Sequence, residues 1–148
     1  MEIRQVGFEE VTNDPAFATL AAEYKNSAAE GMPEIDLQED VYTRLELAGT
    51  MATLAAYVDG TLVGFINVLV TIIPHYGVPL GTTESFFVAP EHRSTGAGLV
   101  LLRRAEELAV SMGAVGLMVS APVGRSLDKV LSRSSYDPMS TIYFRRLQ

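Results

Sequence analysis

The chain has 148 residues with no cysteine and a formal net charge of −7. Its length suits one domain spanning residues 1–148, and 48% hydrophobic residues are enough to form a core. The missing cysteines exclude disulfides, thiolate metal sites and a cysteine nucleophile, and the acidic charge argues against a nucleic-acid partner. The first residues lack a signal-peptide pattern, and the longest apolar stretch, Leu62–Ile73, is too short to span a bilayer, so we expect a cytoplasmic protein with no membrane role.

The first third of the chain predicts one strand and two helices. Ile3–Val6 alternates weakly and is predicted as a first strand. Asp14–Pro15 combines a good helix N-cap with a residue suited to the first turn, and the apolar residues that follow recur at helical spacing. Asp36 and Glu39 have the spacing of a capping box, which predicts a second helix from there to about Gly49.

The middle of the chain predicts three strands. Two apolar segments, Met51–Val58 and Leu62–Ile73, are separated by Asp59–Gly60, the dipeptide that favours a type I′ turn, so they should form a hairpin. Proline and glycine mark Pro74–Gly81 as a loop, and Thr82–Ala89 follows it as a third strand.

The last third begins with the clearest helix of the sequence, Gly96–Met112, whose apolar face and following Gly113 are typical of a helix packed on a sheet. Val115–Val119 is predicted as a buried strand, Ser126–Arg133 as a short helix and Ser140–Arg145 as a final strand. The element order is therefore β-α-α-β-β-β-α-β-α-β, which predicts an α+β fold of three layers with helices on both faces of a mixed sheet.

One segment, residues 84–98, carries a recognisable chemical pattern. A strand leads through a short turn into the long helix, so backbone N–H groups without intrahelical partners converge at the positive end of the helix dipole. Gly96 and Gly98 let a phosphate approach the main chain, and Arg93 can add a charged contact. The segment therefore predicts an anion site suited to a diphosphate.

Other readings of this segment stay open. A glycine-rich turn without a ligand is one, and a nucleotide-binding domain is another. Known nucleotide loops fit less well, because a Walker A loop needs Gly-Lys-Ser/Thr and the dinucleotide fingerprint needs a glycine where Leu101 stands.

The chain resembles the GNAT superfamily of acyl-CoA-dependent N-acetyltransferases, most densely from Glu84 to about Ser120, and the element order supports the resemblance over nearly the whole chain. The resemblance implies a mostly antiparallel, twisted sheet of about six to seven strands flanked by about four helices. It also implies acetyl-CoA as acyl donor, no metal, and backbone pairing of Phe87 and Val88 with the pantetheine arm. The pyrophosphate would lie on the amides of one loop: Arg93, Ser94, Thr95, Gly96, Ala97 and Gly98. The strands carrying Val88 and Val115 would splay apart to admit thioester and amine.

The acceptor in that family is an amine, which must lose a proton before it attacks. Glu84 is the candidate general base, since we place it on the same strand face as Phe86 and Val88 and relatives often carry a carboxylate there. A structural role, holding a neighbouring loop, is the alternative. His75 and Tyr76 in the preceding loop are further candidates for proton transfer or substrate contact.

The general acid of the family has no counterpart here. Alignment with the family's pattern places Leu131 where relatives carry a tyrosine, and Tyr136 occupies a later aromatic position suited to packing. Ser120, at a strand end, is a weak candidate for contact with the sulfur or pantetheine.

Acceptor contacts are expected from Tyr24 to Leu37, from the hairpin and from Pro74–Gly81. Glu30, Glu34 and Asp36 could attract a cation there.

The leading hypothesis is an N-acetyltransferase acting on a primary amine of a small molecule or protein. The alternative is a non-catalytic acyl-CoA sensor of the same fold, suggested by the missing tyrosine. Edge strands and an exposed hydrophobic hairpin suggest a homodimer.

Overall fold

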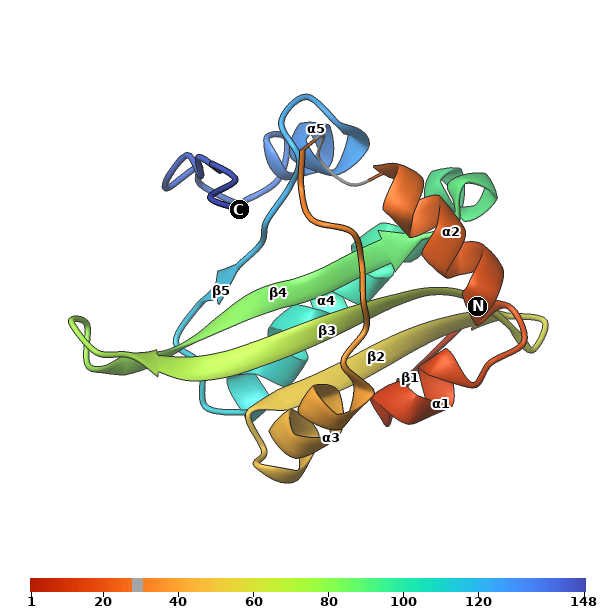
Figure 1. Cartoon of the computed structure of the whole chain (residues 1–148), viewed down its shortest axis with the longest axis horizontal. Coiled ribbons are helices and arrows are strands. Elements are labelled where there is room, and N and C mark those ends of the chain that lie inside the picture. Colours follow the sequence, from red (N-terminus) through yellow and green to blue (C-terminus); the bar gives the residue numbers. More distant parts are fainter. Residues whose placement is uncertain (28–30) are drawn as a thin grey trace.

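The computed structural model describes residues 1–27 and 31–148 (Figure 1). Five strands, five α-helices and one 3₁₀ turn follow one another along this part of the chain. In order they are β1 (Glu2–Val6), α1 (Phe8–Thr12), α2 (Phe17–Ser27), α3 (Glu39–Leu47), β2 (Met51–Val58), β3 (Thr61–Ile73), β4 (Val78–Val88), the turn η1 (Pro90–Thr95), α4 (Ala97–Ser111), β5 (Leu117–Met118) and α5 (Ser126–Leu131).

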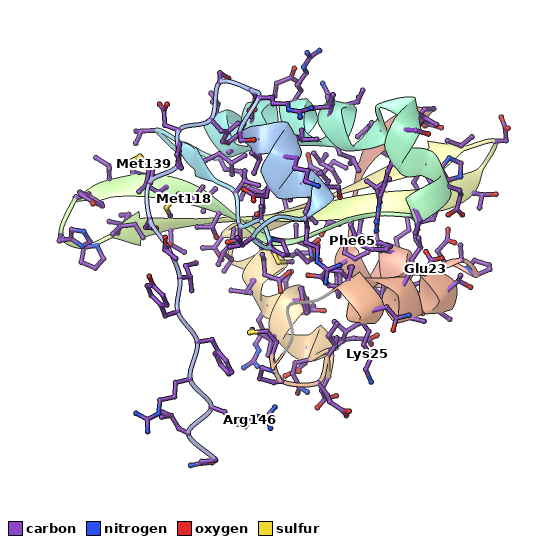
Figure 2. All side chains as sticks on the ribbon, turned by 90° about the horizontal axis from the view of Figure 1, so that it is seen from above. Glu23, Lys25, Phe65, Met118, Met139 and Arg146 are labelled. Atoms are coloured by element: carbon purple, nitrogen blue, oxygen red, sulfur yellow. The ribbon has the colours of Figure 1, made fainter. Side chains whose placement is uncertain are left out.

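The strands form one mixed sheet in the order β1-β2-β3-β4-β5. Neighbouring strands run antiparallel except for the parallel pair β4 and β5, so the predicted fold class is confirmed, with a lower strand count. The predicted strand at Ser140–Arg145 is wrong. Figure 2 shows the chain from Met139 to Arg146 running away from the sheet, where an alternating sequence has no neighbouring strand to pair with.

Each face of the sheet packs against helices and has its own apolar cluster. One cluster joins α4 to the sheet through residues such as Leu101, Ala105 and Ile66, and α5 adds Leu131. The other lies under α1, α2 and α3 and contains Val11, Leu20 and Phe65. The result is the predicted three-layer arrangement, with α4 on one side and α2 and α3 on the other (Figure 2).

The strongest local signals give the predicted structure. Asp59 and Gly60 both have positive φ angles, 50° and 79°, as a type I′ turn requires, and they join β2 to β3. Helix α4 starts after Gly96 and ends before Gly113, both with positive φ. At α2 the Asp14 carboxylate accepts the Ala16 N–H at 2.9 Å and so closes the turn that precedes the helix.

Several elements differ from the predictions. The predicted buried strand Val115–Val119 is reduced to the two-residue β5, which pairs only with Gly81 and Thr82, and Val115 is exposed. The short helix α1 was not predicted, because five residues are too few to show helical periodicity. The capping box is wrong: α3 begins at Glu39 after Gln38, and the Asp36 carboxylate accepts a hydrogen bond from the Gln38 side chain at 3.0 Å instead. Strand β4 begins at Val78, since long pairing with β3 confines the loop to 74–77.

Within the described part of the chain, no helix is long and apolar enough to cross a membrane.

Candidate functional site

The turn between β4 and α4 presents unpaired amides at the start of a 15-residue helix. Gly96 adopts a left-handed conformation with φ 84°, which favours glycine, and its carbonyl accepts the first helical bond, from Val100 N–H at 3.1 Å. The N–H groups of Ala97, Gly98 and Leu99 therefore have no partner inside the helix. These donors, at the positive end of the helix dipole, suit an anionic ligand.

Gly98 is not required by the packing of the protein itself. A Cβ placed there would meet the Phe86 ring at 3.7 Å and the Val88 side chain at 3.8 Å, both ordinary contacts, and its φ is not positive. Packing therefore does not explain the glycine at position 98. A diphosphate at this turn stays a prediction.

Arg93 ties this turn to the end of β4. Its Nε donates a hydrogen bond to the Val88 carbonyl at 2.8 Å, and its guanidinium carbon lies 5.3 Å from the centre of the Phe87 ring. One Arg93 donor is thus used within the protein, and the remaining N–H groups of the exposed side chain can reach a ligand.

The edge of β4 beside this turn is open. Strand β5 pairs with β4 at Gly81 and Thr82 only, and Ser120 N–H donates to the Thr83 hydroxyl at 3.3 Å just beyond. In the part of the chain that the structure describes, no strand accompanies β4 from Glu84 to Val88 on this side. A slot for an extended ligand therefore begins where β5 leaves β4.

The direction of the backbone N–H and C=O groups decides which residues of β4 can pair with a ligand in this slot. Ala89 N–H donates to Val63 O on β3 at 2.9 Å, so the alternation of an extended strand directs the backbone groups of Phe87 toward β3 as well. The backbone groups of Phe86 and Val88 face the open edge, so the expectation that the Phe87 backbone would pair with a ligand there is wrong. The Val88 carbonyl is taken by Arg93, which leaves its N–H as the available donor.

Glu84 lies at the start of the slot because of a β-bulge. Asn67 on β3 pairs with Ser85, and Val68 pairs with Thr83, so Glu84 is an extra residue without a partner in the register. The bulge turns the Glu84 side chain toward the face covered by α3. Phe86 and Val88 pack on the α4 side, so the expectation that Glu84 shares their face is wrong.

Two neutral side chains hold the Glu84 carboxylate. The Tyr42 hydroxyl on α3 donates to Oε1 at 2.8 Å, and Asn67 Nδ2 donates to Oε2 at 3.1 Å. Asn67 Nδ2 also donates to Ser85 Oγ at 2.9 Å, so one amide links both residues of the bulge. The carboxylate itself is exposed, and each oxygen keeps a lone pair for a further donor.

Burial of the Tyr42 phenol, and then its hydrogen bond to Glu84, raises the pKa of this tyrosine well above its usual range. Burial and the Glu84 charge likewise raise the pKa of Tyr24, which lies 5.4 Å from Phe87 between ring centres. Both phenols therefore stay protonated at neutral pH. The carboxylate of Glu84 is the acceptor of this cluster, and the Tyr42 hydroxyl is a donor to it.

The other predicted site residues divide into two groups. Tyr24 lies near Glu84, and Ser120 is exposed where β5 leaves β4. His75 and Tyr76 occupy the tip of the β3–β4 hairpin (Figure 1), and the six residue steps from Val78 to Glu84 put them about 20 Å away along the strand. The structure does not bring them to the carboxylate.

The remaining candidates have ordinary structural contacts. Leu131 is buried in the cluster under α4, and Tyr136 donates its hydroxyl to Glu106 at 2.8 Å. Glu34 forms an exposed ion pair with Lys25 at 3.8 Å. Glu30 lies outside the described residues.

Tyr42 and Asn67 were missed by sequence reasoning. Asn67 carried a readable signal, since it is the one amide within the apolar strand Thr61–Ile73 and its side chain is fully buried. Tyr42 carried none, because its contact with Glu84 spans 42 positions of sequence.

Comparison with known proteins identifies the class. A sequence model described as the acetyltransferase (GNAT) family matches residues 16–127, which include the open edge of β4 and the turn that follows it. The chain belongs to the GNAT acetyltransferase family and is an acyltransferase.

Solved structures with the same fold cover the whole chain. A ribosomal-protein-alanine N-acetyltransferase from Brucella melitensis biovar Abortus 2308 is 21% identical, with a TM-score of 0.70 and 98% of each chain covered. The aminoglycoside N-acetyltransferase AAC(6')-Iy in complex with CoA is 16% identical, with a TM-score of 0.73 and 99% of each chain covered. An acetyltransferase described as putative, from Agrobacterium tumefaciens str. C58, is 16% identical, with a TM-score of 0.71 and 100% of each chain covered. No curated protein matches the chain in sequence.

Proposed function

We propose that this protein transfers an acetyl group from acetyl-CoA to a primary amine by direct attack of the amine on the thioester. The observation that carries the proposal is the position of Glu84. Its exposed carboxylate lies where β5 leaves β4, at the entrance of the slot that an acyl-CoA would occupy. A proton acceptor and a thioester would meet at that point.

The donor end of the slot consists of main chain. The unpaired amides of Ala97, Gly98 and Leu99 would bind the pyrophosphate, and Val88 N–H would pair with the pantetheine arm. Arg93, Ser94 and Thr95 complete the loop around the diphosphate. Acetyl-CoA supplies an activated acyl group, and the protein orients it against the amine.

The acceptor amine determines the proton that Glu84 would have to remove. An alkylammonium with a pKa near 10.4 needs about 4.6 kcal/mol to lose its proton at pH 7. Glu84 would take that proton directly or through water, while the C–N bond forms and the C–S bond breaks to release CoA thiolate. Tyr42 and Asn67 hold the two carboxylate oxygens in place for this transfer.

Release of the thiolate needs little help from the protein. A thiol has a pKa of about 8.5, so its anion leaves readily near neutral pH. Leu131 cannot donate a proton, and water or the exposed Ser120 hydroxyl would serve where relatives use a tyrosine.

Calorimetric titration with acetyl-CoA, and in parallel with ATP and NAD, tests the donor assignment. Selective binding of acetyl-CoA is expected. Equal binding of ATP or NAD would instead support a nucleotide-binding domain, and no binding of acetyl-CoA would overturn the proposal.

A non-catalytic acyl-CoA sensor is the second candidate. It is favoured by the buried Leu131 at the position of the family's acid. Such a protein would bind acetyl-CoA and release no thiol with any amine.

We also propose a homodimer. Large apolar side chains are exposed at the hairpin tip and along the C-terminal segment, which supports an interface with a second copy. They are Ile72, Tyr76, Met139, Ile142, Tyr143, Phe144 and Leu147. Light scattering of the full chain should give twice the monomer mass, and a monomer at micromolar concentration would contradict it. The cytoplasmic location stays a prediction.

A further inference from the structure

A cavity of about 450 Å³ lies directly beside Glu84. Its walls come from α3 and from residues 35–38, the end of the connection that runs across the sheet from α2 to α3 (Figure 1). Glu84 and Tyr42 stand at its sheet side. A molecule that presents an amine to Glu84 would therefore place the rest of its structure in this cavity.

The walls of the cavity are mainly apolar. Four aliphatic side chains line it: Ile35, Leu37, Val41 and Leu45. Two of them leave much of their surface to water, with 42% of Ile35 and 39% of Val41 exposed. An apolar body in the cavity would cover this surface, and the hydrophobic effect would favour its binding.

The charges of the cavity are few and of one sign. Its carboxylates are Glu84 and Asp36, and none of the described residues that line it is a lysine, arginine or histidine. Both carboxylates are held by neutral donors: Asp36 accepts one hydrogen bond from Gln38 at 3.0 Å, and Glu84 accepts one each from Tyr42 and Asn67. Glu84 is the carboxylate that lies on β4 where the slot begins, so it is the one that would attract the reacting ammonium group.

A polycation would be poorly matched to these walls. Each additional ammonium or hydroxyl group placed against the aliphatic side chains of Ile35, Val41 or Leu45 would lose water, and the remaining polar groups of the described lining, on Asp36 and Gln38, could partner few of them. An aminoglycoside or a linear polyamine carries several such groups.

We propose that the acceptor is a primary amine carried by an apolar group, with a single positive charge. This inference rests on the proposed function, because it assigns the cavity to the acceptor of the same reaction. The apolar group can belong to a free alkyl or arylalkyl amine or to the first residue of a peptide, and both share the chemistry that the cavity recognises.

A matched pair of acceptors tests the proposal. Hexylamine and 1,6-diaminohexane have the same chain and differ by one terminal ammonium group. We expect kcat/KM to rise from ethylamine to hexylamine by about fourfold for each methylene group that becomes buried. The diamine should be at least about tenfold poorer than hexylamine. Equal rates for the pair, or a preference for the diamine or an aminoglycoside, would overturn the inference.

Val41→Asp adds a carboxylate to the apolar wall without touching the proton acceptor. This variant should lower kcat/KM for hexylamine. The ratio of kcat/KM for hexylamine to that for the diamine should fall toward one or below it. Val110→Asp is the matched control, since Val110 is 71% exposed on α4, on the other face of the sheet, and its replacement should leave both rates unchanged. An unchanged preference in Val41→Asp would contradict the assignment of the cavity.

Binding measured without turnover separates the two proposals. Calorimetry of hexylamine and the diamine with the acetyl-CoA-free protein reports on the cavity alone. Selective binding of hexylamine without transfer would support the cavity and overturn the proposed enzyme. Transfer to amines without this selectivity would keep the enzyme and overturn the cavity assignment.

Phenethylamine and a peptide with an N-terminal leucine, compared in the same assay, identify the source of the apolar group.

Discussion

The two faces of the central sheet differ in the use of polar side chains. The face under α4 is a layer of Leu, Ile, Val and Ala; its buried Thr83 accepts a hydrogen bond from Ser120 N–H, and the layer fixes the helix whose first turn is the proposed diphosphate site. The face under α2 and α3 also contains apolar residues, but Asn67, Thr53 and Ser85 are buried within or beside it. In the proposed function, the first face positions the donor and the second carries the proton acceptor.

The polar groups of the second face have an energetic cost that the first face avoids. Asn67 Oδ1 is buried and has no hydrogen-bond partner in residues 1–27 and 31–148. Leaving such an atom unpaired costs about 1 to 3 kcal/mol. The cost is offset by the Nδ2 group of the same side chain, which donates hydrogen bonds to Glu84 and Ser85 and so fixes both residues on the bulge. Variants of the second face should therefore change the rate, and variants of the first should change donor binding.

The largest effect is expected from Glu84→Gln. This change keeps the shape of the side chain and removes its ability to accept a proton, so kcat should fall by about 10²- to 10⁴-fold. The Kd of acetyl-CoA should stay within about twofold, because the amides of the donor site are untouched. Stopped-flow or continuous thiol assays and calorimetry measure the two quantities. Glu10→Gln, an exposed carboxylate on α1, is the control and should have no effect on either.

Gly96→Val should weaken the binding of acetyl-CoA rather than slow the proton transfer. The left-handed backbone of Gly96, at φ 84°, is strained by any side chain, which should displace the amides of the loop and weaken acetyl-CoA binding by at least about tenfold. Gly113→Val imposes the same kind of strain at the other end of α4, where φ is 91°. Both variants should lose about 1 to 2 kcal/mol of unfolding free energy. If Gly96→Val and Gly113→Val lost affinity for acetyl-CoA to the same extent, the loop at Gly96 would have no specific role in binding it.

Asn67→Asp should shift the pH dependence of the reaction. The new carboxylate would lie against Glu84 Oε2, where Asn67 Nδ2 is now 3.1 Å away. A like charge disfavours ionisation, so the pKa of the Glu84 carboxyl should rise and the acid limb of the pH–rate profile should move to higher pH by about one unit or more. Activity should recover as the pH increases. An unmoved acid limb in a folded variant would remove Asn67 from the positioning role.

Tyr42→Phe is expected to have the smallest effect. The ring keeps its stacking on Phe8, at 3.9 Å between centres, and only the hydrogen bond to Glu84 is lost. A hydrogen bond to a charged group contributes about 1.5 to 3 kcal/mol, but water can replace the lost donor at the exposed Glu84, so kcat should fall by no more than about 12-fold.

The same variant should alter stability at alkaline pH. The folded state holds the Tyr42 proton more tightly than the unfolded chain, whose phenol titrates near 10.0. The stabilisation is therefore complete below pH 10.0 and is lost as the pH rises from there toward the higher folded pKa. Denaturant unfolding from pH 8 to 11 should show a shallower loss of stability in Tyr42→Phe than in the wild type, and equal slopes would contradict the raised pKa.

Sequence reasoning succeeded where structure is determined locally. Asp59–Gly60 encodes its own turn, and Gly96 and Gly113 mark the limits of α4 through their backbone preferences. It failed where an element depends on a distant partner. The residues Ser140–Arg145 alternate as a strand does, but alternation cannot supply a neighbouring strand.

The candidate site was predictable in part for the same reason. The donor turn is contiguous, so its residues could be identified together. The environment of Glu84 depends on how β3 and β4 align, and one extra residue in that register reversed the face on which its side chain lies. The partners Tyr42 and Asn67 come from positions 42 and 17 residues away.

Thiol release from acetyl-CoA with saturating hexylamine, measured for the wild type and for Glu84→Gln, tests the central claim most directly. The account predicts steady turnover by the wild type, acetylated amine as the product, and a rate at least about 100-fold lower in the variant. Equal rates in the two proteins, with acetyl-CoA bound equally well, would contradict the role of Glu84 and the account of the site built on it.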